Sequence, residues 1–122
     1  MTVDNYLAME NAVETKSFLF AVRIVKLNRY LCENMQAYTL AKQLLKSGTS
    51  IGANICEAQQ AQSRADFISK LSIALKEAVE TNYWLRLLHA TDYLNEKEFS
   101  SLIEDCRELE RLLTAVIKST KL

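Results

Sequence analysis

Apolar residues recur along the chain at helical spacing, most regularly over residues 40–62. Steps of four and three residues give a row that keeps its phase throughout: Leu40, Leu44, Ser47, Ile51, Asn54, Ala58 and Ala61. Positions with this heptad spacing lie on one side of a helix and face a partner helix. The row therefore predicts a helix that packs lengthwise against others, with Ser47 and Asn54 as polar members of its packing side.

Similar spacing predicts three more helices. The first spans about residues 15–33 and has an unusually wide apolar face, made of two adjacent rows: Phe20, Ile24, Leu27, Leu31 and Phe18, Ala21, Val25, Cys32. A short turn at Asn34 and Gln36 separates it from the second helix, which runs to about Gln62. Residues 1–14 carry no clear helix signal and are a frayed start, a vector-derived remnant or an extension of the first helix.

Polar residues at capping positions mark the starts of the last two helices. Ser63 and Asp66 resemble a capping pair, so the third helix begins at about Arg64. Asn95 and Glu98 have the N-x-x-E pattern and start the fourth helix, which runs to the C-terminus. The predicted connections are only a few residues long, which makes neighbouring helices antiparallel.

Gly48 and Gly52 leave two interpretations of the second helix open. Each glycine destabilises a helix interior by about 1 kcal/mol relative to Ala. In one interpretation Gly48 caps a short helix, and Thr49 or Ser50 restarts the chain. In the other the helix is continuous, and its small residues let another backbone approach closely. The unbroken heptad phase favours the continuous helix.

Composition agrees with an all-helical fold. The 122 residues include no Pro and two Gly, and 49% are hydrophobic, whereas strand-rich chains need frequent turn residues. We predict an all-α protein, an antiparallel up-down-up-down four-helix bundle that forms a single domain over residues 1–122. Apolar faces wider than a bundle interior needs also predict a homo-oligomer.

Polar residues beside the heptad rows predict a buried network between the second and third helices. We expect Asn54 and Glu57 to meet Glu77 and Glu80 in a largely buried network that fixes the helix register, because buried polar groups must be paired. The whole polar seam comprises Ser47, Ser50, Asn54, Glu57, Glu77, Glu80 and Thr81.

Three of these carboxylates also belong to the residue type that di-metal bundle sites use. Such sites need Glu-x-x-His on two helices, and the only histidine is His89, which fits no such pattern with Glu57, Glu77 or Glu80. We therefore predict no metal, no cofactor and no catalytic residues. A carboxylate metal-dependent enzyme is kept as an alternative function.

The cysteines and the apolar start of the first helix bear on the compartment. The three cysteines are odd in number and widely spaced: Cys32, Cys56 and Cys106. They fit no metal-ligand or nucleophile pattern and are predicted to be reduced core thiols, as in a cytoplasmic protein. Residues 17–27 are apolar, but they are too few to span a bilayer and are interrupted by Arg23 and Lys26. We predict no membrane association.

The charges balance over the whole chain but not along it. The formal net charge is +0, whereas residues 15–56 carry six Lys or Arg against Glu33 alone, a net charge of +5. Such a basic block is either a solvated face or a surface for nucleic-acid phosphates. The residues we expect to bind RNA or DNA are Arg23, Lys26, Arg29, Lys42 and Lys46.

Two longer motifs resemble those of one protein family. The pattern S-x-x-S-I-x-x-N-I-x-E falls on Ser47, Ser50, Ile51, Asn54, Ile55 and Glu57. The pattern K-E-A-x-E-T-x-Y-W-L falls on Lys76, Glu77, Ala78, Glu80, Thr81, Tyr83, Trp84 and Leu85. From about Phe18 to Ile117 the chain resembles the four-helix bundle proteins first noticed in insertions within bacterial 23S ribosomal RNA genes, the intervening-sequence protein family. Ala58 stands where many members have Gly.

The resemblance implies a ring-shaped homopentamer of antiparallel bundles, in a family that has no established enzyme activity. It also implies a relative, the accessory protein of diversity-generating retroelements, which is a basic pentamer that works with a reverse transcriptase and RNA; this chain lacks that net positive charge. We therefore expect a non-enzymatic oligomeric binding or scaffold protein. Its expected partners are further copies of itself, RNA or DNA, and a reverse transcriptase or another neighbouring protein. The alternative is a protein-partner adaptor that binds no nucleic acid.

Overall fold

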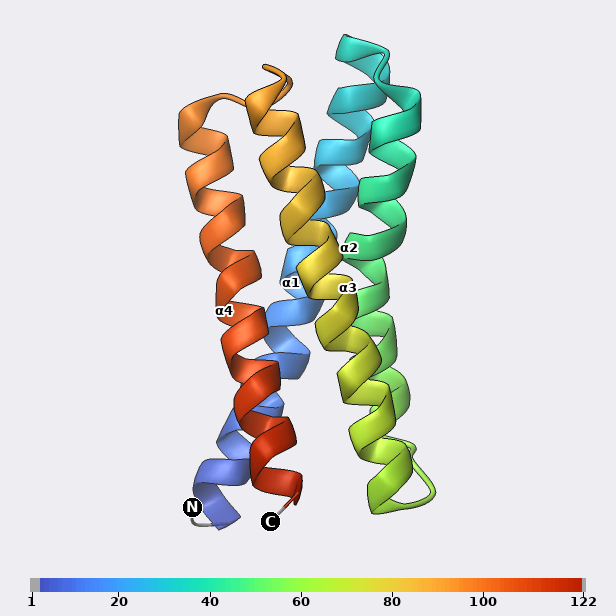
Figure 1. Cartoon of the computed structure of the whole chain (residues 1–122), viewed down its shortest axis with the longest axis vertical. Coiled ribbons are helices and arrows are strands. Elements are labelled where there is room, and N and C mark those ends of the chain that lie inside the picture. The colour runs from blue at the N-terminus through green and yellow to red at the C-terminus, as the bar shows by residue number, and fades with distance from the viewer. Residues whose placement is uncertain (1–2, 122) are drawn as a thin grey trace.

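Four antiparallel helices run up, down, up and down along one long axis (Figure 1). The structure, a computed structural model, describes the backbone of residues 3–121 and the side chains of residues 8–121. The helices are α1 (Val3–Met35), α2 (Tyr38–Ala58), α3 (Arg64–Ala90) and α4 (Glu96–Lys121). Each packs against the next, and α4 packs against α1. This arrangement confirms the predicted all-α four-helix bundle.

The ends of α1 and α2 differ from the predicted ones. Helix α1 begins at Val3, so of the three interpretations left open for residues 1–14 the extension of the first helix is confirmed for residues 3–14, while residues 1–2 lie outside the described part of the chain. Helix α2 ends at Ala58 rather than near Gln62. The amides of residues 59–61 instead bond to carbonyls three residues back, which tightens the chain into turns before α3.

The predicted starts of α3 and α4 are confirmed by their caps. The hydroxyl of Ser63 accepts a hydrogen bond from the Asp66 amide at 3.0 Å, and the Asp66 carboxylate accepts one from the Gln62 amide at 3.2 Å. Asn95 Oδ1 accepts a hydrogen bond from the Glu98 amide at 2.8 Å. These bonds satisfy amides that have no partner within the first helical turn.

The end of α3 is fixed by a left-handed residue that is not glycine. Asp92 has φ 69°, and its amide donates to the carbonyl of His89 at 3.2 Å. The next amide, that of Tyr93, donates to the carbonyl of Leu88 at 2.9 Å. This pair of bonds is the Schellman arrangement, which turns the chain sharply after a helix. It sets the positions of Tyr93 and Leu94 ahead of α4.

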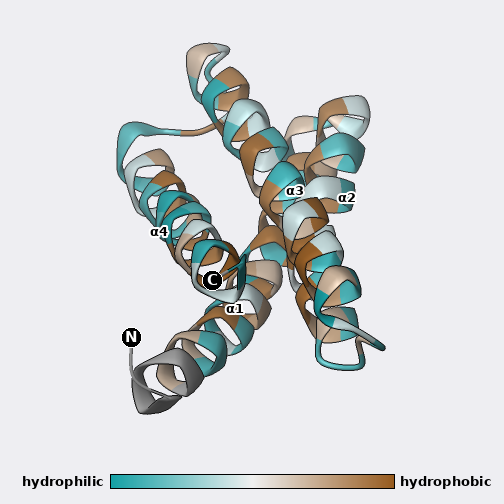
Figure 2. Ribbon diagram, turned by 60° about the horizontal axis from the view of Figure 1, so that its bottom comes forward, coloured by the Kyte–Doolittle hydropathy of each residue, from teal (hydrophilic) through white to brown (hydrophobic). Residues whose placement is uncertain are grey.

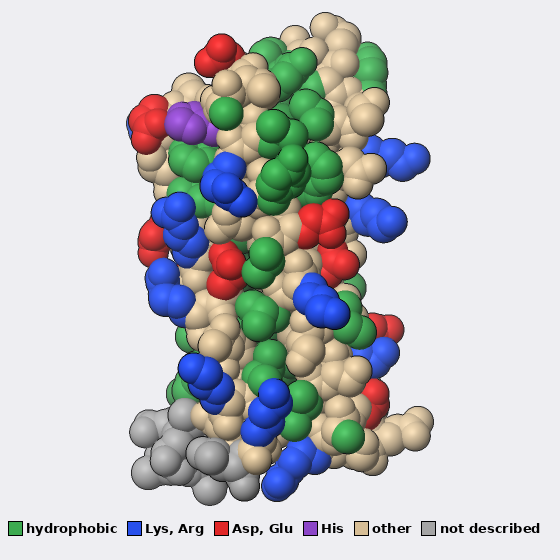
Figure 3. Space-filling model, in the orientation of Figure 1, with side chains coloured by type: hydrophobic (Ala, Val, Ile, Leu, Met, Phe, Trp, Pro, Cys, Tyr) green, Lys and Arg blue, Asp and Glu red, His purple; other side chains and the backbone are tan. Residues whose placement is uncertain are grey.

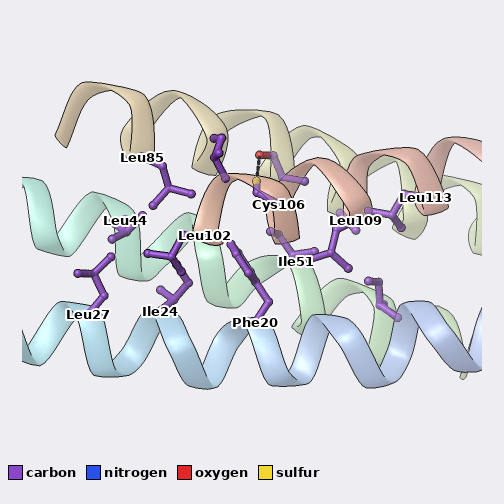
Figure 4. Packing of buried hydrophobic residues seen from close by; sticks show 14 of the residues in the cluster. Phe20, Ile24, Leu27, Leu44, Ile51, Leu85, Leu102, Cys106, Leu109 and Leu113 are labelled. Carbon is purple, nitrogen blue, oxygen red and sulfur yellow. Dashed lines mark hydrogen bonds between the residues drawn. The ribbon is translucent and has the colours of Figure 1, made fainter. Parts of the chain in front are cut away.

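The core lies along the bundle axis. Hydrophobic and hydrophilic residues alternate on every helix, as amphipathic helices require (Figure 2). All four helices supply fully buried side chains (Figure 4), among them Phe20, Ile24, Leu44, Ile51, Leu85, Leu102, Leu109 and Leu113. None of the helices, over the residues described, has the length and apolar character needed to cross a membrane.

Only one of the cysteines is a core thiol. Cys106 is buried, and its thiol donates to the carbonyl of Ala78 at 3.3 Å (Figure 4). Burial raises the pKa of the Cys106 thiol to about 12, with Glu110 adding to the rise. Cys32 is half-buried and Cys56 is exposed, so the prediction of three core thiols is wrong. Cys56 lies on the outer side of α2, one position past the buried stripe that contains Ile55.

Helix α2 is continuous through both glycines, which confirms the favoured interpretation. Gly48 is buried, and a Cβ atom placed there would lie 2.8 Å from Ile24 Cγ2 and 2.9 Å from Ile24 Cγ1. At Gly52 the nearest atom to such a Cβ is the carbonyl oxygen of Ser17, at 3.4 Å. The absence of a side chain at residue 48 is therefore what lets α1 pack this closely on α2.

Candidate functional site

The five cations predicted to bind nucleic acid do not form one face. Arg23 on α1 points to α4, where its guanidinium lies 2.6 Å from the carboxylate of Asp105. Lys46 on α2 lies toward α3, close enough to Glu77 to oppose the rise in that residue's pKa. These two cations therefore lie on opposite sides of the α1–α2 hairpin.

The remaining three cations are exposed on the same hairpin: Lys26, Arg29 and Lys42. None of the three makes an ion pair with another side chain in the part of the chain that the structure describes. Together with Lys46, which is also exposed, they are the cations of the hairpin that make no ion pair among the described residues.

Two members of the predicted polar seam meet in the core. The side chains of Ser47 on α2 and Thr81 on α3 are 1% and 0% exposed, and their hydroxyl oxygens are 2.9 Å apart. Thr81 Oγ1 also lies 2.7 Å from the carbonyl oxygen of Glu77, and Ser47 Oγ lies 3.4 Å from that of Leu44. Every buried polar atom of this pair has a partner, so the pair links α2 to α3 without leaving an unsatisfied group.

The other seam residues do not form the predicted buried network within the chain. Asn54 Nδ2 donates to the carbonyl of Ser50 in its own helix at 2.8 Å. Glu57 is exposed and lies 4.0 Å from Lys70, and Glu80 is exposed and accepts a hydrogen bond from Trp84 Nε1 at 3.2 Å. That part of the prediction is wrong. Glu57 and Glu80 lie beside the packing side of their helices and are exposed, and the Asn54 amide bonds to a carbonyl of its own helix instead.

The carboxylates do not assemble a metal site. Partial burial raises the pKa of Glu77, the nearby Glu80 raises it further, and Lys46 opposes both. Glu57 on α2 lies 4.0 Å from Lys70 on α3. Among the described residues, no group of three or more His, Cys, Asp or Glu side chains is placed to hold a metal ion.

A hollow of about 530 Å³ opens between α1 and the α3–α4 turn, which we call the α1–α4 hollow. Helices α1 and α4 lie close together at the end that carries both termini and diverge toward the other end (Figures 1 and 2). The hollow lies at the diverging end and is lined by Arg23, Lys26, Leu27, Tyr30, Tyr93, Leu94, Asn95 and Glu98.

Sequence reasoning found only part of this lining. Arg23 and Lys26 were singled out for their charge, whereas the tyrosines were not assigned to any site. The spacing of residues 23, 26, 27 and 30 places them on one stripe of a helix. The sequence predicts that stripe, but the position of Tyr93 beside it depends on the conformation of the turn after α3.

A second opening, the α1–α2 groove, has a volume of about 550 Å³. Its lining is mostly small or apolar and includes Ser17, Phe18, Thr49, Gly52, Ala53 and Cys56. Phe18 is 68% exposed and its neighbour Leu19 is 57% exposed. The wide apolar face predicted for the first helix is therefore only partly covered within one chain.

Helix α3 also exposes apolar side chains. Val79 is 52% exposed, Tyr83 is 49% exposed and Ile73 is 39% exposed. On the face seen in Figure 3, hydrophobic side chains gather most densely over the upper part of α3. Helices α1 and α3 are diagonal in the bundle and do not pack on each other, so these two apolar surfaces are separate.

The fold and this site define a four-helix bundle protein with uncovered apolar surface and dispersed surface cations. Residues 9–115 match the model of the 23S rRNA-intervening sequence protein family, and the chain belongs to that family. Both motifs that carry the resemblance lie inside the matched range.

A solved relative has the same fold. It is a protein of unknown function from the S23 ribosomal protein family of Bacteroides thetaiotaomicron, 54% identical in sequence, with a TM-score of 0.89. The similarity covers 90% of this chain and 98% of that one. No curated protein matches the chain.

Proposed function

We propose that this protein is a non-enzymatic, cytoplasmic binding protein that works as a homo-oligomeric ring. The observation that carries the proposal is the pair of separate apolar surfaces, one around Phe18 and Leu19 on α1 and one around Val79 and Tyr83 on α3. Exposed apolar patches of this kind mark interaction sites. Because the two surfaces are on diagonal helices, contact between different surfaces of successive copies is head-to-tail. Such contacts form a ring when the rotation from one copy to the next closes the circle.

The shape of the α1 surface suits a second copy of the chain. The α1–α2 groove is lined largely by small and apolar residues such as Gly52 and Ala53, and Glu14 is the one charged residue among the described residues of its lining. The α3 surface offers projecting apolar side chains, Val79 and Tyr83, of a size that fills such a groove. A ring of five copies is the number that the family resemblance implies.

Light scattering on purified protein tests the oligomer. We expect a particle mass several times the 13.9 kDa of one chain. Phe18→Glu and Val79→Glu should each lower this mass, because an unpaired charge is costly to bury in an interface. Tyr38→Glu is the control, since Tyr38 is 61% exposed and lies outside both surfaces. A wild-type particle of single-chain mass at high protein concentration would rule the ring out.

Nucleic acid is the ligand that we propose for the oligomer. The support is the set of exposed cations on the α1–α2 hairpin, Lys26, Arg29, Lys42 and Lys46, which a ring repeats once per copy. Arg23 contributes less to this surface because Asp105 holds its guanidinium. Repetition of a modest basic patch multiplies the number of phosphate contacts, which makes up for a net charge of +0 per chain.

Mobility-shift titrations with single-stranded RNA, structured RNA and duplex DNA test this ligand. We expect Arg29→Gln/Lys42→Gln to weaken binding and to reduce the slope of log affinity against log salt by about 0.7 per lost contact for a single strand. The matched control is Lys118→Gln/Lys121→Gln, two exposed lysines at the end of α4. If the oligomer forms but no nucleic acid binds at low salt, the protein-partner adaptor is the better description, with a reverse transcriptase or another neighbouring protein as its candidate partner.

A further inference from the structure

We propose that the α1–α4 hollow binds a nucleotide, with its phosphate on the α1 wall and its base against the two tyrosines. The inference deepens the proposed nucleic-acid function. It rests on that function if the bound nucleotide belongs to a nucleic-acid strand. A free mononucleotide has the same chemistry and tests the hollow by itself. The hollow is distinct from the α1–α2 groove, and the two share no lining residue.

The size of the hollow suits a ligand of this class. Its volume of about 530 Å³ lies in the range of about 300 to 1,000 Å³ that small-molecule sites occupy. The floor is apolar, because Leu27 and Leu94 line it and each is only 6% exposed. A ligand with a flat, uncharged part would bind more tightly here, because that part leaves water and is buried against the apolar floor.

Two aromatic rings reach the hollow from opposite sides. Tyr30 comes from α1 and is 48% exposed, and Tyr93 comes from the α3–α4 turn and is half-buried. The backbone bond from the Tyr93 amide to Leu88 fixes the turn that presents the second ring. Planar heteroaromatic bases stack on tyrosine whatever their sequence, because every base has a π-face.

The charges are arranged asymmetrically. On the α1 wall Lys26 makes no ion pair among the described residues, and Arg23 gives one side of its guanidinium to Asp105 at 2.6 Å. A guanidinium has five N–H donors, so donors of Arg23 remain for an oxyanion. On the turn wall Glu98 supplies a carboxylate. A ligand that satisfies both walls has an anionic group at one end and hydroxyl or amino donors at the other, which describes a nucleotide.

One residue on each wall of the hollow is held in place by a bond within the protein. Asn95 in the lining uses its Oδ1 to cap α4, at 2.8 Å from the Glu98 amide. The Asp105 contact keeps Arg23 on the α4 side of α1. These two lining residues are therefore in place before a ligand arrives, which reduces the ordering that binding requires.

Calorimetric titration of the full chain with adenosine 5′-monophosphate tests the inference. We expect one binding event per chain, and we expect adenosine and ribose 5-phosphate each to bind about tenfold more weakly, since each lacks one half of the recognised chemistry. Equal binding of adenosine and the monophosphate, or no binding of the monophosphate, would overturn the inference.

Matched variants locate the binding. Tyr30→Leu and Lys26→Gln should each weaken monophosphate binding about tenfold, whereas Tyr38→Leu and Lys118→Gln should leave it unchanged, because both control residues are exposed and outside the hollow. Tyr30 and Lys26 are exposed, so these variants are expected to keep the fold even where Tyr93→Leu does not. Equal effects of Tyr30→Leu and Tyr38→Leu would overturn the assignment.

A single-stranded oligoadenylate separates this inference from the proposed function. If the strand binds and the monophosphate does not, the hollow is not a nucleotide site while the nucleic-acid function stands. If the monophosphate binds at the hollow and the strand does not bind at all, the nucleic-acid function fails and the hollow is a site for free nucleotides. Loss of strand binding in Arg29→Gln/Lys42→Gln with monophosphate binding retained supports both, as two sites that share Lys26.

Discussion

Helix α1 packs against its two neighbours in different ways. Toward α2 the contact is close, because buried Gly48 leaves room only for the side chain of Ile24. Toward α4 the described contacts include two ion pairs, Lys16 with Glu108 at 2.9 Å and Arg23 with Asp105 at 2.6 Å, and every one of these side chains is at least 32% exposed. Beyond the second ion pair the two helices separate around the α1–α4 hollow.

The two contacts of α1 should therefore contribute differently, the α1–α2 contact to stability and the α1–α4 boundary to binding. Truncating a buried branched side chain costs about 2 to 5 kcal/mol, whereas an exposed ion pair contributes about 0 to 1 kcal/mol. The α1–α2 contact should therefore hold the hairpin together, and the α1–α4 contact should tolerate change. A loosely held boundary with a preformed opening is a suitable place for a ligand, because few contacts have to be given up there.

The largest expected effect is at the close contact. Ile24→Ala should lower the free energy of unfolding by about 2 to 5 kcal/mol, because Ile24 is 0% exposed and its removal leaves a cavity against α2. Denaturant unfolding at a fixed protein concentration measures this, since oligomer stability depends on concentration. Glu33→Gln, at an exposed position of the same helix outside both openings, should change stability by less than about 0.5 kcal/mol. Similar losses in both variants would contradict the comparison.

A methyl group added on the other side of this contact should also destabilise. Gly48→Ala places its Cβ 2.8 Å from Ile24 Cγ2, and such overpacking costs about 1 to 3 kcal/mol, partly offset by about 1 kcal/mol of helix propensity. The net loss should be about 0 to 2 kcal/mol. Ile24 is β-branched and stiff in a helix, so it cannot simply turn away.

A double-mutant cycle sharpens this prediction. Ile24→Ala removes the two Cγ atoms that crowd the new Cβ, so Ile24→Ala/Gly48→Ala should lose less stability than the two single losses together. Simple additivity would mean that the two residues do not crowd each other, and the close contact would then have another cause.

The sequence was enough to predict the helices, but it predicted only some of the contacts between them. The heptad rows and the Ser63 and Asn95 caps were enough to predict the bundle and two helix starts, because both signals are local. The end of α3 was not marked by the usual glycine, since Asp92 adopts the left-handed conformation instead. A sequence pattern has no equivalent signal for that exception.

The burial of individual side chains was less predictable than the helices, because adjacent positions around a helix differ in burial. Ser47 and Thr81 lie in the packing rows and are buried, whereas Glu57 and Glu80 lie beside those rows and are exposed. The basic residues show the same limit. Spacing along α1 could not tell that Arg23 meets Asp105, because that contact joins residues 82 positions apart.

On the open side of α1 the expected effect is small. Asp105→Asn removes the partner of Arg23, and it should lower the free energy of unfolding by less than about 1 kcal/mol because the pair is partly exposed. The effect should shrink further at high salt, which screens exposed pairs. Unfolding measured at low and high salt checks this, with Glu104→Gln as the control, since Glu104 pairs with Arg111 inside α4. A loss as large as that of Ile24→Ala would show that both sides of α1 are equally tight.

The smallest expected effect has the opposite sign. Gly52→Ala places its Cβ 3.4 Å from the Ser17 carbonyl oxygen and 3.5 Å from Ser17 Oγ. These are ordinary contact distances, so the higher helix propensity of Ala should dominate and raise the free energy of unfolding by about 0.5 kcal/mol. The measurement is the same denaturant unfolding, performed beside Gly48→Ala. The two glycines are one helical turn apart, so opposite signs would show that the close approach of α1 is centred on Ile24, whereas a loss at both would show that it extends along α2 to Ser17.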